Sequence, residues 1–386
     1  MAVEVYLDNA ATTPVLPAVK QALIEVLDIY GNPSSLHEQG AKAQRVLDQA
    51  RTQMQRGLGL RTGKIIFTGG GTEANNTAIF GTVARHGRRG HHLVTTAIEH
   101  PSVLEAFRAL ERQGWSVSYV MPQSDGSVEA SDILHAVTPE TVLVSMMHVN
   151  NETGAVLPIE EVADGLSAFP KTLLHVDGIQ GFGKVKTNLH SQNIHMYSVS
   201  GHKLGAPKGI GALYVRAGLD IHPLLYGGGQ EFGLRSGTEN IPGIHAFAVA
   251  AKLASDEQAE QEKRVFHLRT LLRDRLKHHP RCIVHEPRRV SPYILSVSFR
   301  LLKGEVLVHA MEMEGVYVST GSACSTKGGR VAASHVLQAM HVSEEEITGT
   351  LRLSLARWTT EAEVLHAADV ILKQVDWLYE VGGIHR

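Results

Sequence analysis

The sequence predicts an α/β protein with two parts, a large domain built on a mostly parallel sheet and a smaller α+β domain. Between about residues 40 and 255, short apolar runs rich in β-branched residues alternate with amphipathic helical patterns. This alternation is typical of a parallel sheet whose two faces are covered by helices. After Asn240 the alternation stops, and one long helical pattern leads into a mixed segment. We therefore expect a large domain over residues 14–256 and a small domain formed by residues 1–13 and 257–386.

Seven strands are predicted for the large domain, because seven short runs have the composition of buried strands. They are Lys64–Thr68, His92–Thr96, Val117–Val120, Thr141–His148, Leu173–Asp177, His195–Ser200 and Ile210–Val215. Between most of them lie helical patterns with one apolar face, namely Ala41–Leu58, Thr72–His86, Pro101–Arg112 and Pro158–Ala168. We expect one sheet of seven strands, most of them parallel, covered by these helices.

The small domain is predicted to follow a bridging helix that runs from Ile241 to about His279, apolar at first and charged later. The elements expected after it are strands at Tyr293–Phe299, Val316–Ser319 and Thr350–Ser354, a helix at Glu305–Glu314, and a last helix from Thr360. Thr360 with Glu363 three residues later has the pattern of a capping box, which marks the start of that last helix. The segment up to about Thr13 can pack with either domain.

The composition is that of an ordinary enzyme-sized protein and argues against several classes. The formal net charge is −2, so no surface dedicated to nucleic acid is expected. The two cysteines, Cys282 and Cys324, stand in no metal-binding spacing and cannot form a disulfide framework. No apolar run approaches the roughly 20 residues of a membrane span, and no secretion signal opens the chain. We expect a cytoplasmic protein with no metal, no membrane association and no direct nucleic-acid partner.

A lysine in SVSGHKLGAPKGIG, residues 198–211, is the first candidate for chemistry. Lys203 follows an apolar strand that ends in Ser200, and the small residues after it allow other groups to approach closely. Taken alone, such a lysine is more often a surface charge than an amine that captures an electrophile. The segments that surround it in the fold decide between these interpretations.

Two further segments favour the chemical interpretation. In LLHVDGIQ, Asp177 ends a parallel strand, where open α/β sheets bind their ligands. Its carboxylate either caps the next helix or pairs with a protonated ring nitrogen. In FTGGGTEANN, the glycines from Gly69 to Gly71 lead from a strand into a helix that Thr72 opens. Backbone N–H groups at such a start bind anions, and the spacing suits one phosphate better than a dinucleotide.

A Schiff-base lysine, a carboxylate for a pyridinium nitrogen and a phosphate cup are the three requirements of pyridoxal 5′-phosphate (PLP). This cofactor also gives a reason for Cys324, which lies in GSACSTKGGR, residues 321–330, among glycines and small polar residues. A cysteine in a polar segment with basic neighbours can ionise and act as a nucleophile. An amino acid activated by PLP would offer its sulfur to that thiolate.

Ten motifs spread over nearly the whole chain resemble those of one enzyme family. They are YLDNAATTP, GNPSSLH, FTGGGTEANN, TTAIEHPSV, MHVNNETG, HVDGIQGFGK, SGHKLGAPKGIG, GGGQEFGLRSGTEN, STGSACS and LRLSLARW. In them the chain resembles the cysteine desulfurases of the NifS/IscS type, which are class V aminotransferase-like PLP enzymes of fold-type I. The resemblance implies that L-cysteine is converted to L-alanine while its sulfur passes to Cys324 as a persulfide, and from there to an acceptor.

The resemblance also implies roles for the residues around the cofactor. Lys203 matches the lysine that forms the Schiff base and shuttles the Cα proton, and His100 matches the imidazole that stacks on the ring as acid and base. Asp177 would keep the pyridine nitrogen protonated, and Gln180 would donate to the phenolic oxygen. The residues implied in holding the phosphate are Gly71, Thr72, Ser200, His202 and, from the neighbouring subunit of an obligate homodimer, Thr238.

Substrate binding and sulfur delivery follow from the same resemblance. Arg352 would bind the carboxylate of L-cysteine bidentately, helped by Asn32 and by Asn151, which also borders the cofactor. Without the family match, a strand-end ion pair is the alternative for Arg352. Cys282 has no comparable setting and is expected to be structural. The stretch KGGRVAA after Cys324 is longer and more basic than in the best-known members, so the acceptor stays open between an iron–sulfur scaffold, a tRNA-thiolation protein and another carrier.

Three alternatives remain open from the sequence. Selenocysteine lyase, cysteine sulfinate desulfinase and aminotransferase reactions use the same scaffold, although release of selenium or sulfinate needs no thiol such as Cys324. A non-catalytic platform in a sulfur-trafficking complex is disfavoured because all the chemical positions are present. A cysteine hydrolase that pairs Cys324 with a histidine leaves Lys203 and Asp177 unexplained.

Overall fold

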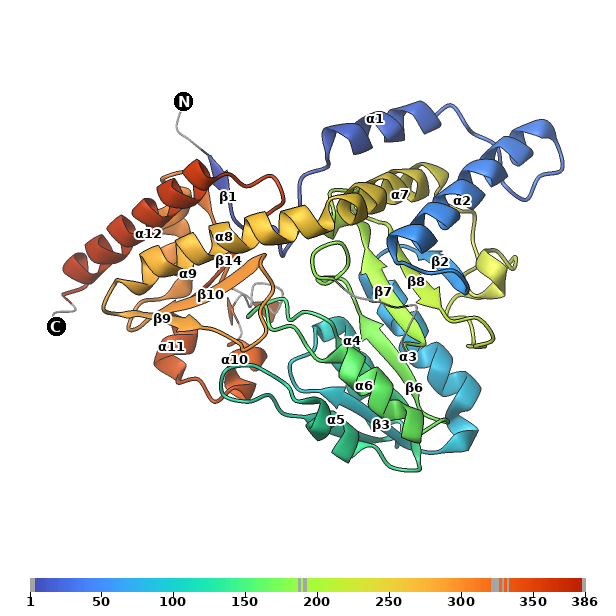
Figure 1. Ribbon diagram of the computed structural model, residues 1–386, viewed down its shortest axis with the longest axis horizontal. Coiled ribbons are helices and arrows are strands. Elements are labelled where there is room, and N and C mark those ends of the chain that lie inside the picture. The colour runs from blue at the N-terminus through green and yellow to red at the C-terminus, as the bar shows by residue number, and fades with distance from the viewer. Residues whose placement is uncertain are drawn as a thin grey trace.

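The large sheet has the seven strands and the mostly parallel arrangement that the sequence predicts. Figure 1 shows the computed structural model, which describes residues 4–186, 189, 193–320, 326–327, 330–331 and 333–383. The strand order is β2-β8-β7-β6-β5-β3-β4, with β8 antiparallel to both its neighbours and the other pairs parallel. The strands are β2 (Lys64–Thr68), β3 (His92–Thr96), β4 (Ser116–Val120), β5 (Thr141–Met147), β6 (Leu173–Asp177), β7 (Met196–Ser200) and β8 (Gly211–Val215).

Helices cover both faces of this sheet, which is why β3, β5, β6, β7 and β8 are buried along their whole length. Successive residues enter different cores: Ile66 packs with α3 and α4, and Ile65 packs with α2, α5, α6 and α7. The helices are α1 (Pro17–Val26), α2 (Glu38–Gly57), α3 (Gly71–His86), α4 (Pro101–Arg112), α5 (Ala130–Ala136), α6 (Ile159–Gly165) and α7 (Ile241–Asp256). In the described part of the chain, no helix combines the length and apolar character needed to cross a membrane.

The C-terminal region builds a separate core around a three-stranded antiparallel sheet of order β14-β10-β9. Thr360 caps α12 through the reciprocal bonds with Glu363 that the sequence predicts. The elements are α8 (Gln258–Lys277), β9 (Cys282–His285), β10 (Ile294–Phe299), α9 (Gly304–Glu312), β11 (Val316–Tyr317), β12 (Thr326–Lys327), β13 (Arg330–Val331), α10 (His335–Ala339), α11 (Glu344–Thr348), β14 (Thr350–Ser354) and α12 (Glu361–Val381).

The predicted single helix from Ile241 to His279 is wrong, because the structure has two helices there, α7 and α8. The break falls at Glu257, whose φ of −99° and ψ of −4° depart from helical values. The two halves serve different cores: α7 packs on α1 and α2, whereas α8 packs on α12 (Figure 1). The apolar first half and the charged second half of the predicted helix are therefore two elements with different partners.

The N-terminal segment connects the two cores. Its first strand, β1 (Val5–Tyr6), pairs in parallel with β11 of the C-terminal region, and Asp8 bridges Ser354 at the end of β14. A few residues later, the backbone N–H of Thr13 donates to the carbonyl of His202, beside β7 of the large sheet. Residues 8–13 therefore pass between the C-terminal core and the turn that carries Lys203.

Candidate active site

Side chains from several strands meet where β5, β6 and β7 end, near the start of α3. Asp177 is the last residue of β6 and Ser200 the last residue of β7. Lys203 closes a single 3-10 turn, Gly201–Lys203, directly after β7, and Asn151 follows β5. Open α/β sheets bind ligands at the carboxyl ends of their strands, so this cluster is the candidate active site.

Asp177 is buried and held by two donors at this edge of the sheet. Its Oδ1 accepts from the backbone N–H of Ile179 at 3.0 Å, and its Oδ2 accepts from Nδ2 of Asn75 at 2.7 Å. Burial raises the pKa of Asp177, and these two bonds and the amine of Lys203 oppose that shift. The carboxylate is therefore placed to hold a positively charged group at the end of the strand.

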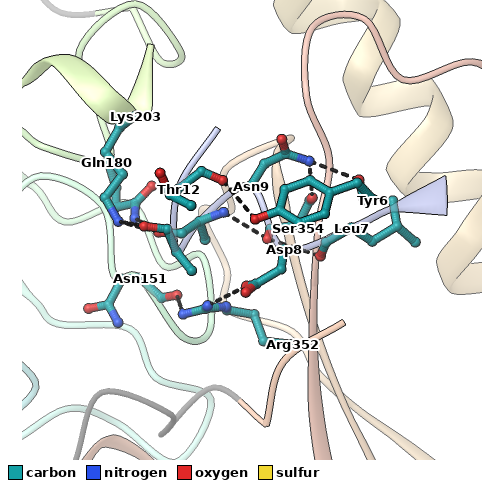
Figure 2. Close-up of polar contacts among 12 residues, drawn as sticks. Tyr6, Leu7, Asp8, Asn9, Thr12, Asn151, Gln180, Lys203, Arg352 and Ser354 are labelled. Carbon is teal, nitrogen blue, oxygen red and sulfur yellow. Dashed lines mark hydrogen bonds and ion pairs between the residues drawn. The ribbon is translucent and has the colours of Figure 1, made fainter. Parts of the chain in front are cut away.

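The amine of Lys203 lies against the N-terminal segment. Its Nζ donates to the backbone carbonyls of Ala10 and, at 2.7 Å, of Ala11. Nε2 of Gln180 donates to the same Ala10 carbonyl at 2.8 Å, so the two predicted residues meet on one backbone oxygen (Figure 2). Nζ of Lys184 completes the group by donating to Oε1 of Gln180 at 3.0 Å.

The start of α3 packs closely against the end of β7 and the residues after β6. Gly71 faces this contact, because an added Cβ would lie 2.2 Å from Cδ1 of Ile179 and 3.3 Å from Cβ of Ser200. The hydroxyl of Ser200 is buried and has no hydrogen-bond partner among the described residues, and a buried hydroxyl without a partner is costly. Nδ1 of His202 lies 3.1 Å from Oγ1 of Thr12. Thr72 stands in the exposed first turn of α3.

His100 is the N-cap residue of α4, and its side chain faces the site. Nδ1 accepts from the backbone N–H of Ser102 at 3.1 Å and lies 2.8 Å from its Oγ. Burial lowers the pKa of His100 to about 4. Lys203, His335 and Arg352 shift that pKa in the same direction, so the imidazole is neutral at physiological pH.

Arg352 lies buried on β14 and already has an anionic partner. Its Nη2 donates to Oδ1 of Asp8 at 2.8 Å, and its Nη1 donates to the backbone carbonyl of Asn151 at 3.1 Å (Figure 2). Nε is buried and, within the described ranges, has no acceptor. Arg352 thus forms an ion pair with Asp8, which is the alternative role that the sequence left open. This ion pair leaves Nε available for a second anion.

Two predicted residues stand outside this cluster. Asn32 is exposed in the loop between α1 and α2, where its Oδ1 accepts from the backbone N–H of Ser34 at 3.0 Å. Thr238 is exposed in the loop before α7. Cys324 lies outside the described residues. Cys282 is half-buried on β9, and burial raises its pKa to about 12, so its thiol resists ionisation.

The sequence motifs did not point to Asp8, Asn75, Ser102 and Lys184, all of which contact predicted site residues. Each stands inside a quoted motif. Asp8 and Asn75 bind residues 344 and 102 positions away, whereas Ser102 and Lys184 bind residues two and four positions away. The one available signal was a polar side chain on the buried face of a helix, as at Asn75 one turn after Gly71. In the ranges that the structure describes, no three His, Cys, Asp or Glu side chains form a group that could hold a metal ion.

Comparison with known proteins identifies the family of this chain. The model of the class V aminotransferase family matches residues 5–366, and the chain belongs to that family. Cysteine desulfurase 2 of Trichormus variabilis is 42% identical over 93% of this chain and 90% of its own length. Cysteine desulfurase IscS of Dictyoglomus turgidum is 37% identical over 97% and 95%. A solved NifS-like protein superimposes with a TM-score of 0.91, at 36% identity over 97% of this chain and all of that one.

Proposed function

We propose that this protein is a PLP-dependent cysteine desulfurase that converts L-cysteine to L-alanine and transfers the sulfur to Cys324 as a persulfide. One observation carries the proposal: the carboxylate of Asp177, the amine of Lys203 and the buried hydroxyl of Ser200 meet at one edge of the sheet. A pyridine nitrogen, an aldehyde and a phosphate require these three groups. Membership of the class V family and relatives named as cysteine desulfurases support the same activity.

The residues present fit PLP. The unpartnered Ser200 hydroxyl and the start of α3 suit a phosphate, and Asp177 suits a protonated ring nitrogen. Gln180 would donate to the phenolic oxygen, since Lys184 occupies its Oε1 and leaves its Nε2 as the donor. When bound, PLP supplies an electron sink that makes the Cα proton of the substrate acidic. The residues proposed to hold its phosphate are Gly71, Thr72, Ser200, His202 and Thr238 of the neighbouring subunit, and Asn151 would border the ring.

Arg352 is proposed to bind the substrate carboxylate, with Asn151 and Asn32 as neighbours. Asp8 supports this role, because its bond to Nη2 orients the guanidinium while Nε stays available. A planar guanidinium with fixed orientation binds a carboxylate through two parallel hydrogen bonds. A solved relative, titled SspA in complex with cysteine, is 32% identical over 92% of this chain and all of that one, with a TM-score of 0.80.

Three residues are proposed to carry the proton and sulfur transfers. Nζ of Lys203 takes the Cα proton of the substrate. The neutral imidazole of His100 exchanges protons with the substrate, as base and as acid. The thiolate of Cys324 attacks the substrate sulfur. The new S–S bond forms as the C–S bond breaks, and the electron pair of that bond stays with the carbon, which a proton completes as alanine.

The assembly is proposed to be a cytoplasmic homodimer in which Thr238, exposed in the loop before α7, would contact the phosphate of the neighbouring subunit. The proposed large domain comprises residues 14–256, and the proposed small domain comprises residues 1–13 and 257–386, which include Cys324.

The acceptor of the persulfide sulfur would be a protein, either an iron–sulfur scaffold or a tRNA-thiolation protein. Relatives named IscS favour the scaffold.

Mass spectrometry after incubation with L-cysteine tests the reaction. We expect a gain of one sulfur on the peptide that carries Cys324, lost on reduction, with alanine in the supernatant. The Cys324→Ala variant should lose L-cysteine turnover while it still releases selenium from L-selenocysteine; Cys282→Ala is the matched control and should keep full activity. A Cys324→Ala enzyme with unchanged L-cysteine turnover would contradict the role of this thiol.

Borohydride reduction of the PLP-loaded protein tests the cofactor. Reduction should fix the cofactor to the peptide that carries Lys203. Lys184 is the matched control, since it is a second buried lysine only one side chain away, through Gln180. Attachment to the Lys184 peptide, or a protein that binds no PLP, would overturn the assignment.

A further inference from the structure

A chain of hydrogen bonds joins His100 to Asp177 inside the protein. Nδ2 of Asn75 lies 2.7 Å from Oδ2 of Asp177 and 2.9 Å from Oγ of Ser102. Oγ of Ser102 in turn lies 2.8 Å from Nδ1 of His100. Asn75, Ser102 and Asp177 are all buried, so solvent does not compete for these bonds, and their strength and direction are set by the protein.

Chemistry fixes the direction of each bond in this chain. A carboxylate only accepts, so Asn75 must turn its amide nitrogen towards Asp177. The same nitrogen donates to Oγ of Ser102, and the single hydroxyl hydrogen of Ser102 is then directed to Nδ1 of His100. The backbone N–H of Ser102 also points at Nδ1, at 3.1 Å.

Nδ1 of His100 therefore receives hydrogen bonds from the backbone N–H and, in this arrangement, from the hydroxyl of Ser102. A proton on Nδ1 would face both the amide hydrogen and the hydroxyl hydrogen of Ser102, and both bonds would be lost. The backbone N–H of Ser102 cannot turn round to accept, and the donation from Asn75 fills one of the two acceptor positions of the Ser102 hydroxyl. A neutral imidazole has one protonated and one bare nitrogen, so the proton is left to Nε2.

We propose that Asn75 and Ser102 are positioning residues that hold His100 as the neutral tautomer protonated on Nε2, which makes Nε2 the atom that exchanges protons at the site. The exchange with substrate rests on the proposed desulfurase function, whereas the tautomer itself does not. Lys203 beside β7, His335 on α10 and Arg352 on β14 face the imidazole and disfavour its cationic form as well. The hydrogen-bond chain adds what these charges cannot, a choice between the two nitrogens.

The test is NMR of the PLP-loaded, full-length protein with ¹⁵N-labelled histidine, titrated with acid, with His100→Gln to assign the signal. The wild type should show a bare Nδ1 and a protonated Nε2. Ser102→Ala removes one donor and should raise the pKa of His100 by roughly half to one unit, the effect of one lost hydrogen bond. The acid limb of kcat/KM for L-cysteine should move to higher pH by the same amount.

Three further variants sharpen the test. Ser102→Thr keeps the hydroxyl and should restore the wild-type titration. Asn75→Ala removes the donor that steadies the hydroxyl and should raise the pKa of His100 by less than Ser102→Ala does. Asn76→Ala is the matched control, since Asn76 follows on the same helix but donates only to the backbone carbonyls of Thr72 and Ser102; it should leave the titration unchanged.

Two results would overturn the proposal: a proton on Nδ1 in the wild type, or a folded Ser102→Ala holoenzyme in which His100 titrates as before. If Asn75→Ala does not fold, the pair Ser102→Ala and Ser102→Thr decides alone. The NMR spectra need no substrate, so a failure of the proposed desulfurase reaction leaves this test intact. An active desulfurase with the other tautomer would reject only the inference about Asn75 and Ser102.

Discussion

The amine of Lys184 donates to Oε1 of Gln180 across 3.0 Å in the interior of the protein. Burial lowers the pKa of Lys184 to about 7, and the charges of Lys203 and Arg352 add to the shift. The bond fixes the amide of Gln180 with its nitrogen towards the carbonyl of Ala10, to which the amine of Lys203 also donates. Lys184 is therefore a buried support of the site whose pKa lies well below that of an ordinary lysine.

Replacing Lys184 by Met should change how stability depends on pH. The ordinary lysine pKa is 10.5, so between about pH 7 and 10 the unfolded chain binds more protons than the folded one, and stability rises with pH. We expect the free energy of unfolding of the wild type to rise by roughly 2 to 4 kcal/mol relative to that of Lys184→Met across this window. Urea unfolding at both ends measures the difference. Lys171→Met, at an exposed lysine, should show no such trend; a parallel trend in both variants would contradict the assignment.

Replacing Glu99 by Gln should have the opposite pH dependence. Burial raises the pKa of Glu99 to about 8 from an ordinary 4.5, although Thr96 and the backbone N–H of Met147 donate to its Oε1. The folded protein then binds the extra proton, so the stability of the wild type falls as pH rises from about 4.5 to about 8.

Glu99→Gln keeps the shape and the acceptor oxygen without the ionisation. Between about pH 5.5 and about pH 8.5, its free energy of unfolding should rise by a few kcal/mol relative to that of the wild type. Urea unfolding measures this difference. Glu105→Gln, at an exposed carboxylate paired with Arg108, is the control. Equal stability of wild type and Glu99→Gln at the higher pH would mean that Glu99 ionises freely.

Replacing Ser200 by Ala should act differently on the two forms of the protein. Without PLP the hydroxyl is buried and lacks a partner among the described residues, so its removal should leave the melting temperature unchanged or slightly higher. Affinity for PLP should fall roughly 10-fold to 100-fold, the effect of one hydrogen bond to a charged group. Titration of the apoprotein with PLP, followed by absorbance, gives the comparison. Unchanged affinity would remove Ser200 from the phosphate site.

Replacing Arg352 by Lys should separate substrate binding from cofactor binding. A lysine keeps the charge beside Asp8 but loses the planar pair of donors. We expect KM for L-cysteine to rise roughly 10-fold to 100-fold with unchanged PLP affinity. Arg300→Lys, at an exposed arginine paired with Glu346, should leave both constants as in wild type. Loss of PLP affinity with a constant KM would place Arg352 on the cofactor instead.

The sequence predicted the large sheet well, because strands buried on both faces are continuous apolar runs such as Thr141–Met147. It also predicted the placement of Asp177, Ser200 and Lys203, since each stands at or just after the end of a predicted strand. The break at Glu257 was missed because periodicity continues across it; only the choice between two cores separates α7 from α8.

The supporting contacts could not be predicted, because they depend on packing between distant segments. Asn75 meets Asp177 across 102 positions, and Asp8 meets Arg352 across 344. Lys184 lies only four positions from Gln180, but its burial depends on the C-terminal core, where its amine faces the ring of Tyr293. A local pattern carries no information about such partners, so these residues emerged only from the fold.

The route of the N-terminal segment has a mechanical consequence. The stretch from Val5 to Thr13 is bonded to β11 and β14 at one end and to the His202 carbonyl at the other. In between, it receives two hydrogen bonds from Lys203. If the C-terminal core shifted by even a fraction of an ångström, residues 5–13 would move with it. The amine of Lys203, which is bonded to the carbonyls of Ala10 and Ala11, would then be displaced. Residues 5–13 thus link the two cores, and a deletion within them should displace the amine of Lys203 without altering a side chain of the site.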